Sequence, residues 1–210
     1  MEIILDELVA RYEKLTRLKE SIETTANMLI SAYRNNKKVL VCGNGGSSAD
    51  AGHIVGELMK SFEAPRSLDL TIQQNLRDSF GIQGKLLAET LQQGLPAISL
   101  CEHSALLTAI SNDLGGEFIF AQQVMGYGNT DDILLALSTS GNARNVLNAL
   151  ITAKAKGMKT IGLTGENGGE MKALCDVVIN VPATQTAHVQ ELHLPVYHAL
   201  CMMVEKALFN

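Results

Sequence analysis

The sequence lacks the features that would point to a membrane, to secretion or to nucleic acid. No uncharged apolar run approaches the roughly 18 residues that span a bilayer. The N-terminal MEIILDELVARYEKL carries acidic residues where a secretory signal requires a basic start and an apolar core. The 17 basic and 22 acidic side chains give a net charge of −5, without the basic excess typical of nucleic-acid-binding surfaces. We therefore expect a cytoplasmic protein that binds neither membranes nor nucleic acid.

Cysteine and aromatic residues are also scarce. The four cysteines show no CxxC spacing, and 4% of the 210 positions are aromatic. Three of the cysteines (Cys42, Cys101 and Cys175) lie in or beside apolar runs, which favours buried, reduced thiols over disulfides or nucleophiles. In contrast, 46% of the positions are hydrophobic. That share is enough for a substantial core, so disorder is excluded, and the length favours a single domain over 1–210.

Short apolar runs alternate with helical patterns along the chain. Each run is apolar at successive positions rather than at every second one, which is typical of parallel strands covered by helices on both faces. We therefore predict an α/β fold, a three-layer α/β/α sandwich around a five-stranded parallel sheet. The expected strands are 38–42, 97–101, 133–138, 159–164 and 176–181, and the expected helices are 48–61, 104–112, 117–127, 142–156 and 186–209.

Two further helical segments lie outside this alternation. Apolar residues recur at helical spacing through 1–36, which predicts an N-terminal extension of one long helix or two in series. Residues 62–95 hold another helical pattern, broken at Gly81 and Gly84, in a connection that already follows a helix. We interpret this segment as a helical insertion that either enlarges a surface or subunit contact or covers a site.

Two of the predicted strands end in loops rich in glycine and hydroxyl groups. The first strand leads into GNGGSS (43–48) and the third into STSGN (138–142), each directly before a predicted helix. Ligands of open α/β sheets collect beyond the carboxyl ends of the strands, where glycines and free N–H groups at a helix start suit an anion. Serine and threonine hydroxyls can complete a phosphate cradle without lysine. Two such loops favour phosphate binding over two ordinary tight connections.

The first loop does not match the nucleotide-binding patterns. It is not GxxxxGK[ST], which excludes a P-loop, and it fails the GxGxxG pattern because Ser48 replaces the last glycine. No acidic residue ends the second strand, at 97–101, where a dinucleotide site requires one. We therefore do not expect a dinucleotide cofactor.

Four motifs together resemble a known family. CGNGGSSADAGH, LSTSGN, GLTGENGG and VQELHLPVYH are similar to the SIS (sugar isomerase) domain, and most of all to the phosphoheptose isomerases. The resemblance runs from about Lys37 to the C-terminus, apart from the insertion. It implies a flavodoxin-like fold, a homotetramer, and an aldose–ketose isomerase that converts sedoheptulose 7-phosphate to D-glycero-D-manno-heptose 7-phosphate through an enediol.

The resemblance also implies roles for individual residues of this chain. One group would bind the substrate, with hydroxyls on its phosphate and polar side chains on its sugar: Ser47, Ser138, Thr139, Ser140, Asn44, Asp113 and Gln190. A second group would hold one zinc ion: His53, Glu57, Gln190 and His198. Of these, Glu57 and His198 would exchange protons with the substrate, because moving a proton between adjacent carbons needs an acid and a base.

The spacing of the implied zinc ligands is informative. His53 and Glu57 are four residues apart and share one helix face, which suits zinc. Gln190 and His198 would lie about 12 Å apart along a straight helix and roughly 80° apart around it. Either Pro195 kinks the helix, or a neighbouring copy supplies one ligand. The two other polar candidates in this segment, Glu191 and His193, are interpreted as structural residues or as partners of a ligand.

Three features depart from the phosphoheptose isomerase pattern. Ala143 stands where a phosphate-binding serine is common, Ala187 stands where an acidic residue is common, and the insertion at 62–95 is long. These departures leave two alternatives open: an isomerase of another sugar phosphate, or a non-catalytic SIS protein that binds a partner such as a replication initiator. Retention of all four implied metal ligands argues against the second.

Overall fold

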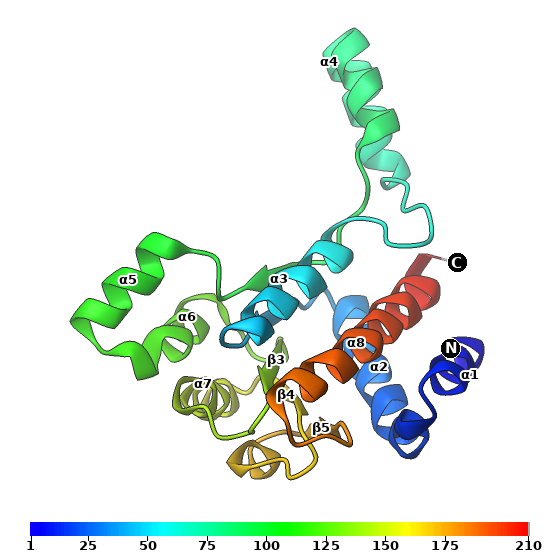
Figure 1. Cartoon of the computed structure of the whole chain (residues 1–210). Coiled ribbons are helices and arrows are strands. Elements are labelled where there is room, and N and C mark those ends of the chain that lie inside the picture. The colour runs from blue at the N-terminus through cyan, green and yellow to red at the C-terminus, as the bar shows by residue number, and fades with distance from the viewer. Residues whose placement is uncertain (210) are drawn as a thin grey trace.

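Five parallel strands form one sheet in the computed structural model, which describes residues 1–209 (Figure 1). The strands follow the order β2-β1-β3-β4-β5, an order typical of flavodoxin-like folds. This arrangement confirms the α/β prediction with its five-stranded parallel sheet. The strand bounds are β1 Val39–Cys42, β2 Ala97–Ser99, β3 Ile133–Ser138, β4 Lys159–Thr164 and β5 Val177–Asn180.

Helices cover both faces of the sheet and complete the three layers. One face packs against α1 (Glu2–Arg11), the 3-10 helix η1 (Glu13–Leu18), α2 (Lys19–Arg34), α3 (Gly46–Met59) and α8 (Thr186–Phe209). The other face packs against α6 (Ile119–Tyr127), α7 (Arg144–Ala155) and the 3-10 helix η3 (Glu170–Ala173). Helix α5 (Ser104–Asp113) and the 3-10 helix η2 (Gly116–Phe118) flank this second layer. The N-terminal extension consists of two α-helices in series, α1 and α2, which the 3-10 helix η1 connects.

The strand sequences explain why both faces are covered. Alternate residues of β1 enter different cores: Val39 and Val41 pack with α2, α3 and α8, while Leu40 and Cys42 pack with α6 and α7. All four are fully buried. Because each face needs apolar side chains, the strands read as continuous apolar runs.

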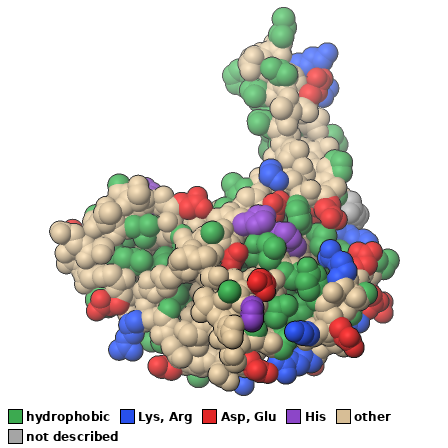
Figure 2. All heavy atoms as spheres, viewed as in Figure 1, with side chains coloured by type: hydrophobic (Ala, Val, Ile, Leu, Met, Phe, Trp, Pro, Cys, Tyr) green, Lys and Arg blue, Asp and Glu red, His purple; other side chains and the backbone are tan. Residues whose placement is uncertain are grey.

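The insertion forms a helical hairpin that projects from the body (Figures 1 and 2). Helix α4 (Leu70–Thr90) is interrupted at Phe80 and Gly81, where Gly81 adopts φ 53° and ψ −133°. The backbone of Gly84 lies against the carbonyl of Leu76, so the two arms pack side by side. Gly81 interrupts the helix as expected, and the chain reverses there. The prediction that Gly84 also breaks the helix is wrong, because Gly84 lies within the second arm. Only glycine permits its close approach to the carbonyl of Leu76.

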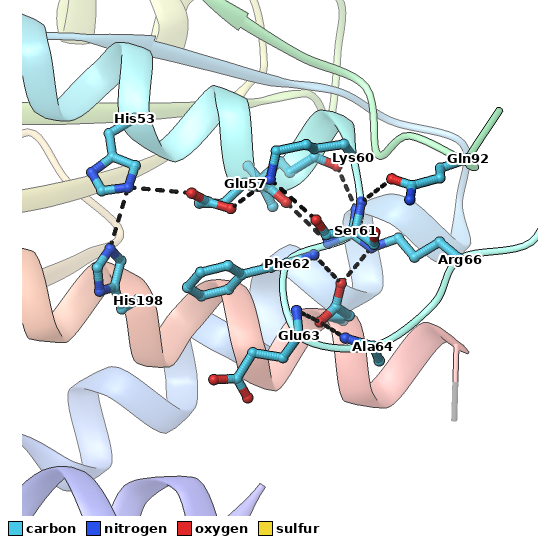
Figure 3. Close-up of polar contacts among 12 residues, drawn as sticks. His53, Glu57, Lys60, Ser61, Phe62, Glu63, Ala64, Arg66, Gln92 and His198 are labelled. Carbon is cyan, nitrogen blue, oxygen red and sulfur yellow. Dashed lines mark hydrogen bonds and ion pairs between the residues drawn. The ribbon is translucent and has the colours of Figure 1, made fainter. Parts of the chain in front are cut away.

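A buried carboxylate joins α8 to residues 62–66, the foot of this hairpin (Figure 3). Glu205 of α8 accepts hydrogen bonds from the backbone N–H groups of Phe62, Glu63 and Ala64 at 2.8–2.9 Å, and from Arg66 Nε at 2.7 Å. Burial alone would raise the pKa of Glu205, but these four donors outweigh it and hold the pKa below its usual value. The group is therefore a charged anchor inside the protein.

Arg66 extends this anchor to α3. Its guanidinium donates to the carbonyl oxygens of Leu58 at 2.6 Å and Glu57 at 3.0 Å, at the C-terminal end of α3. Arg66 and Glu205 are each 1% exposed. The pair therefore connects α3, the foot of the hairpin and α8, the three segments that surround the site described below.

The cysteines agree with the expectation of buried thiols that form no disulfides. All four thiols are free; Cys42 and Cys201 are buried, and Cys101 and Cys175 are partly buried. Burial raises the pKa of Cys175 and of Cys201 to about 12, which makes thiolate chemistry unfavourable. Within residues 1–209, none of the helices combines the length and apolar character that crossing a membrane requires.

Replacement of Glu205 by glutamine tests the anchor. The variant Glu205→Gln leaves the Arg66 charge buried without its carboxylate, and we expect the free energy of unfolding to fall by about 3–5 kcal/mol. The matched control is Asp6→Asn, because Asp6 pairs with Lys19 at 2.6 Å on the surface, where such a pair contributes less than about 1 kcal/mol. Urea unfolding measures both. Equal losses in the two variants would show that the buried pair is no more important than the exposed one.

Candidate active site

The loop between β1 and α3 turns sharply and places a helix N-terminus at the carboxyl edge of the sheet. A Cβ on Gly43 would lie 2.6 Å from the backbone oxygen of Ser47, so this turn requires glycine. Gly45 has φ +56° directly before α3 begins. Ser47, in the first turn of α3, is 3% exposed. The positive end of the helix dipole at this position favours an anion.

The loop after β3 is held in place by the motif that follows β4. The backbone N–H of Gly165 donates to the carbonyl of Thr139 at 3.1 Å, and that of Met171 donates to the carbonyl of Gly141 at 3.0 Å. Asn142 Oδ1 accepts from the N–H of Glu170 at 2.9 Å. The GLTGENGG motif and the two residues that follow it therefore support the STSGN loop. Within the loop, Ser138 is buried, Thr139 is partly buried and Ser140 is exposed.

A reciprocal amide pair connects the two loops. Asn44 Nδ2 donates to Asn145 Oδ1, and Asn145 Nδ2 donates to Asn44 Oδ1, both at 2.9 Å. Asn44 belongs to the first loop, and Asn145 lies in the first turn of α7, directly after the second. This contact brings the N-termini of α3 and α7 to one place at the carboxyl edge of the sheet. Two helix N-termini with serine and threonine hydroxyls form a cradle suited to phosphate.

A cluster of two histidines and one carboxylate lies between α3 and α8 (Figure 3). His53 Nε2 lies 3.2 Å from Glu57 Oε1 and 3.4 Å from His198 Nε2. Glu57 Oε2 also accepts from Lys60 Nζ at 3.2 Å. The His53 side chain is 42% exposed and that of Glu57 is 13% exposed. Figure 2 shows histidine side chains reaching the surface near the foot of the hairpin.

The environment keeps His198 neutral near pH 7. Burial, and next the proximity of His53, lowers the pKa of His198 below its usual value, although Glu57 acts in the opposite direction. A neutral imidazole can accept a proton or coordinate a cation. The electrostatics of the cluster are therefore compatible with either role.

The donor atoms of this cluster suit a divalent cation such as zinc. Two imidazole nitrogens and a carboxylate oxygen are common zinc ligands, and bonds of about 2.0–2.1 Å place tetrahedral ligand atoms roughly 3.3–3.4 Å from one another. The separations of 3.2 and 3.4 Å around His53 Nε2 match this spacing. Within residues 1–209, no three His, Cys, Asp or Glu side chains form a preassembled metal-binding group. The cluster thus presents two adjacent pairs rather than a closed cage.

Two of the residues selected from the sequence lie apart from this cluster. Gln190, near the start of α8, packs its amide against Gly46 at the start of α3, so it adjoins the phosphate cradle. Asp113 is exposed at the end of α5 and accepts from Asn112 at 2.8 Å. In the described part of the chain, no hydrogen bond or ion pair connects Asp113 to either loop.

The two other polar candidates of α8 remain outside the cluster. His193 is fully buried, and burial lowers its pKa to about 4. Glu191 is exposed and borders a different hollow, beside Lys14 and His188. These positions agree with the structural interpretation of both residues.

Two polar residues of the site were not selected from the sequence. Asn145 follows the STSGN motif closely, and its amide was the available signal. Tyr197 precedes His198 and contacts His53 Nδ1 through its hydroxyl at 3.0 Å. Nothing in the local pattern of α8 indicates that contact, because it depends on how α8 packs against α3.

Comparison with protein families identifies the fold and several relatives. The SIS domain family matches residues 5–80 and 77–165. A phosphoheptose isomerase from a Nitratiruptor species is 40% identical over 197 residues, covering 93% of this chain and 91% of the relative. A phosphoheptose isomerase from Helicobacter pylori is 38% identical over 209 residues, covering 98% of this chain and 95% of the relative.

A solved structure gives the same result. A phosphoheptose isomerase from Francisella tularensis superposes with a TM-score of 0.78 at 34% identity, covering 94% of this chain and 91% of that one. The similarity therefore extends over nearly the whole chain in both sequence and structure.

A pair of glycine substitutions in α3 tests the placement of Gln190. In Gly46→Ala the new methyl group would occupy the space of the Gln190 amide, and we expect that flexible side chain to move while the protein stays folded. The control is Gly56→Ala, where the methyl meets nothing within 4 Å and should stabilise the helix by about 0.5–1 kcal/mol. The Gln190 side-chain amide resonance in ¹⁵N NMR reports the displacement. An unchanged resonance in Gly46→Ala would contradict the observed contact.

Proposed function

This chain belongs to the SIS domain family, and we propose that it is an isomerase that interconverts sedoheptulose 7-phosphate and D-glycero-D-manno-heptose 7-phosphate. The observation that carries the proposal is the 38–40% identity, over more than nine tenths of the chain, to relatives named phosphoheptose isomerase. The geometry of the site also supports the proposed activity. A cradle suited to phosphate lies at the edge of the sheet, and side chains able to accept and donate protons lie on α3 and α8.

The phosphate of the substrate would bind at the two loops. Ser47, Ser138, Thr139 and Ser140 offer hydroxyls there, and the N-termini of α3 and α7 offer N–H groups. Binding energy from the phosphate end orients the reacting carbons at the opposite end of the sugar. Asn44 and Gln190 adjoin the cradle and would contact sugar hydroxyls, whereas Asp113 would require another copy of the chain.

The proton transfers would use Glu57 and His198. In the ketose-to-aldose direction, the Glu57 carboxylate takes a proton from C1 to form the cis-enediol and returns it to C2. Neutral His198 moves a proton between the oxygens on C1 and C2. Lys60 Nζ lies 3.2 Å from Glu57 Oε2, on the side of the carboxylate away from His53 Nε2, which contacts Oε1. Together these steps move one proton between two carbons and one proton between two oxygens. The substrate therefore gains and loses no atoms.

We further propose that His53, Glu57, His198 and Gln190 hold one zinc ion. The donor atoms of the first three, and their spacing around His53 Nε2, support this assignment. When bound, the ion would act as a Lewis acid on the carbonyl and hydroxyl oxygens of the sugar. Since Gln190 lies against Gly46, it is the ligand whose side chain would have to reorient.

The assembly that we propose is a cytoplasmic homotetramer. Exposed apolar side chains on the hairpin, including Leu70, Ile82 and Leu86, are 80%, 92% and 55% exposed in the single chain and favour burial against another copy. A phosphorylated sugar is charged and crosses membranes poorly, which favours an enzyme in the compartment where the sugar is made.

Replacement of the proposed base tests the reaction. We expect Glu57→Gln to lower kcat by at least about 10²-fold, because the amide cannot accept the carbon-bound proton. Conversion of sedoheptulose 7-phosphate, followed by ¹H NMR in deuterated water, measures turnover and exchange at C1 and C2. The control is Glu23→Gln, an exposed carboxylate on α2. Wild-type activity in Glu57→Gln would remove this residue as the base.

Removal of divalent cations tests the metal assignment. After dialysis against a chelator, we expect turnover to fall at least tenfold and to return with zinc, because the Lewis acid is lost and regained. Undiminished turnover in the chelator-treated protein would exclude a catalytic metal. If the zinc-loaded wild-type protein turns over other sugar phosphates and not the heptose phosphate, the substrate assignment is wrong. No turnover of any sugar phosphate would favour the non-catalytic alternative.

A further inference from the structure

Tyr197 lies between a carboxylate and the inner nitrogen of His53. Its hydroxyl is 3.0 Å from His53 Nδ1 and donates to Asp50 Oδ1 at 3.2 Å. Tyr197 belongs to α8 and is 1% exposed, while Asp50 and His53 lie on α3. The three residues therefore form a relay across the contact between the two helices. It reaches Nδ1 of His53, whereas Glu57 and His198 lie beside Nε2, at the other edge of the ring.

The carboxylate of Asp50 sets the direction of one hydrogen bond in the relay, and the tautomer of His53 sets the direction of the other. A carboxylate can only accept, so the single proton of the Tyr197 hydroxyl is used on Asp50. With that proton used on Asp50, the tyrosine oxygen accepts from His53 when the proton of the neutral imidazole resides on Nδ1. In that tautomer the other nitrogen, Nε2, carries a lone pair. That lone pair is directed to the side of the ring where Glu57 and His198 lie.

The tyrosine ring also restricts the orientation of both histidines. It meets the His53 ring edge-on at 5.4 Å and the His198 ring edge-on at 5.0 Å, with interplanar angles of 75° and 90°. Because the ring is enclosed in the core between α3 and α8, it has little freedom to turn. Both imidazoles therefore pack against one rigid surface.

We propose that Tyr197, oriented by Asp50, is a positioning residue that sets His53 in its Nδ1–H tautomer and presents the Nε2 lone pair to the site. The consequence for a cation, or for a proton shared with Glu57, is that the accepting atom is ready before binding. Only this consequence rests on the proposed function; the tautomer does not.

The tautomer can be observed directly. Selective ¹⁵N labelling yields signals from five histidines only, and the ¹⁵N shifts of His53 in chelator-treated protein distinguish its two tautomers. We expect the Nδ1–H form in the wild type and a mixture in Tyr197→Phe. In Asp50→Ala the tyrosine proton is released and can be donated to Nδ1, so the Nε2–H form should dominate. A wild-type protein with the proton on Nε2 would overturn the proposal.

Zinc binding provides the second readout, with zinc itself as the probe. We expect Tyr197→Phe and Asp50→Ala to bind zinc about 10–100-fold more weakly than the wild type, which is the usual effect of losing a partner of a metal-binding histidine. The matched control is Tyr33→Phe. Tyr33 is also buried, but its hydroxyl has no hydrogen-bond partner among residues 1–209, so its removal should leave zinc affinity and the His53 tautomer unchanged.

The outcomes separate this inference from the proposed function. If neither variant of the relay changes the tautomer or the zinc affinity, Tyr197 has no positioning role, whatever the wild-type enzyme catalyses. If both variants behave as expected but the wild type converts no heptose phosphate, the proposed function fails and the relay remains. If Tyr197→Phe does not fold, Asp50→Ala gives the deciding result.

Discussion

The arrangement of the site depends on the buried contact between Glu205 and Arg66. A carboxylate inside a protein is costly unless its oxygens are satisfied, and here three backbone N–H groups and a guanidinium satisfy them. None of these donors lies in the helix that carries Glu205. The contact can form only when α8, α3 and the foot of the hairpin have reached their final positions, so it selects one packing of these elements.

This packing determines how the chemistry-bearing residues meet. His53 and Glu57 lie on one helix and His198 on another, and Arg66 binds the carbonyl of Glu57 directly while its partner Glu205 lies two turns beyond His198. The relative position of α3 and α8 is therefore held at one end by the ion pair and in the middle by Tyr197 between Asp50 and His53. A cluster whose donor atoms lie 3.2–3.4 Å apart requires such support, because a shift of about 1 Å between the helices would separate them.

The strands of the sheet could be predicted from the sequence, whereas the contacts between helices could not. Residues 133–138 and 159–164 are strands with the bounds that their apolar runs indicate, because strands covered on both faces carry a local signal. The two loops and the pair His53 and Glu57 also lie in local motifs. In contrast, Tyr197 and Glu205 read as ordinary members of a helix, and their partners are more than 130 residues away. Gly84 shows the same limit, since its need for glycine arises from the facing arm and not from its own segment.

The hairpin has a consequence for how the chain tolerates change. Its base is closed by the antiparallel bridge between Ser67 and Gln92 and by the bond from Gln93 N–H to the carbonyl of Arg66 at 2.9 Å. Beyond that base, its arms have no extensive contact with another helix or strand of residues 1–209. Lengthening or shortening the arms would thus leave the loop-closure entropy of the body nearly constant. Within the single chain, this segment can therefore change in length without altering the scaffold that holds the reactive groups.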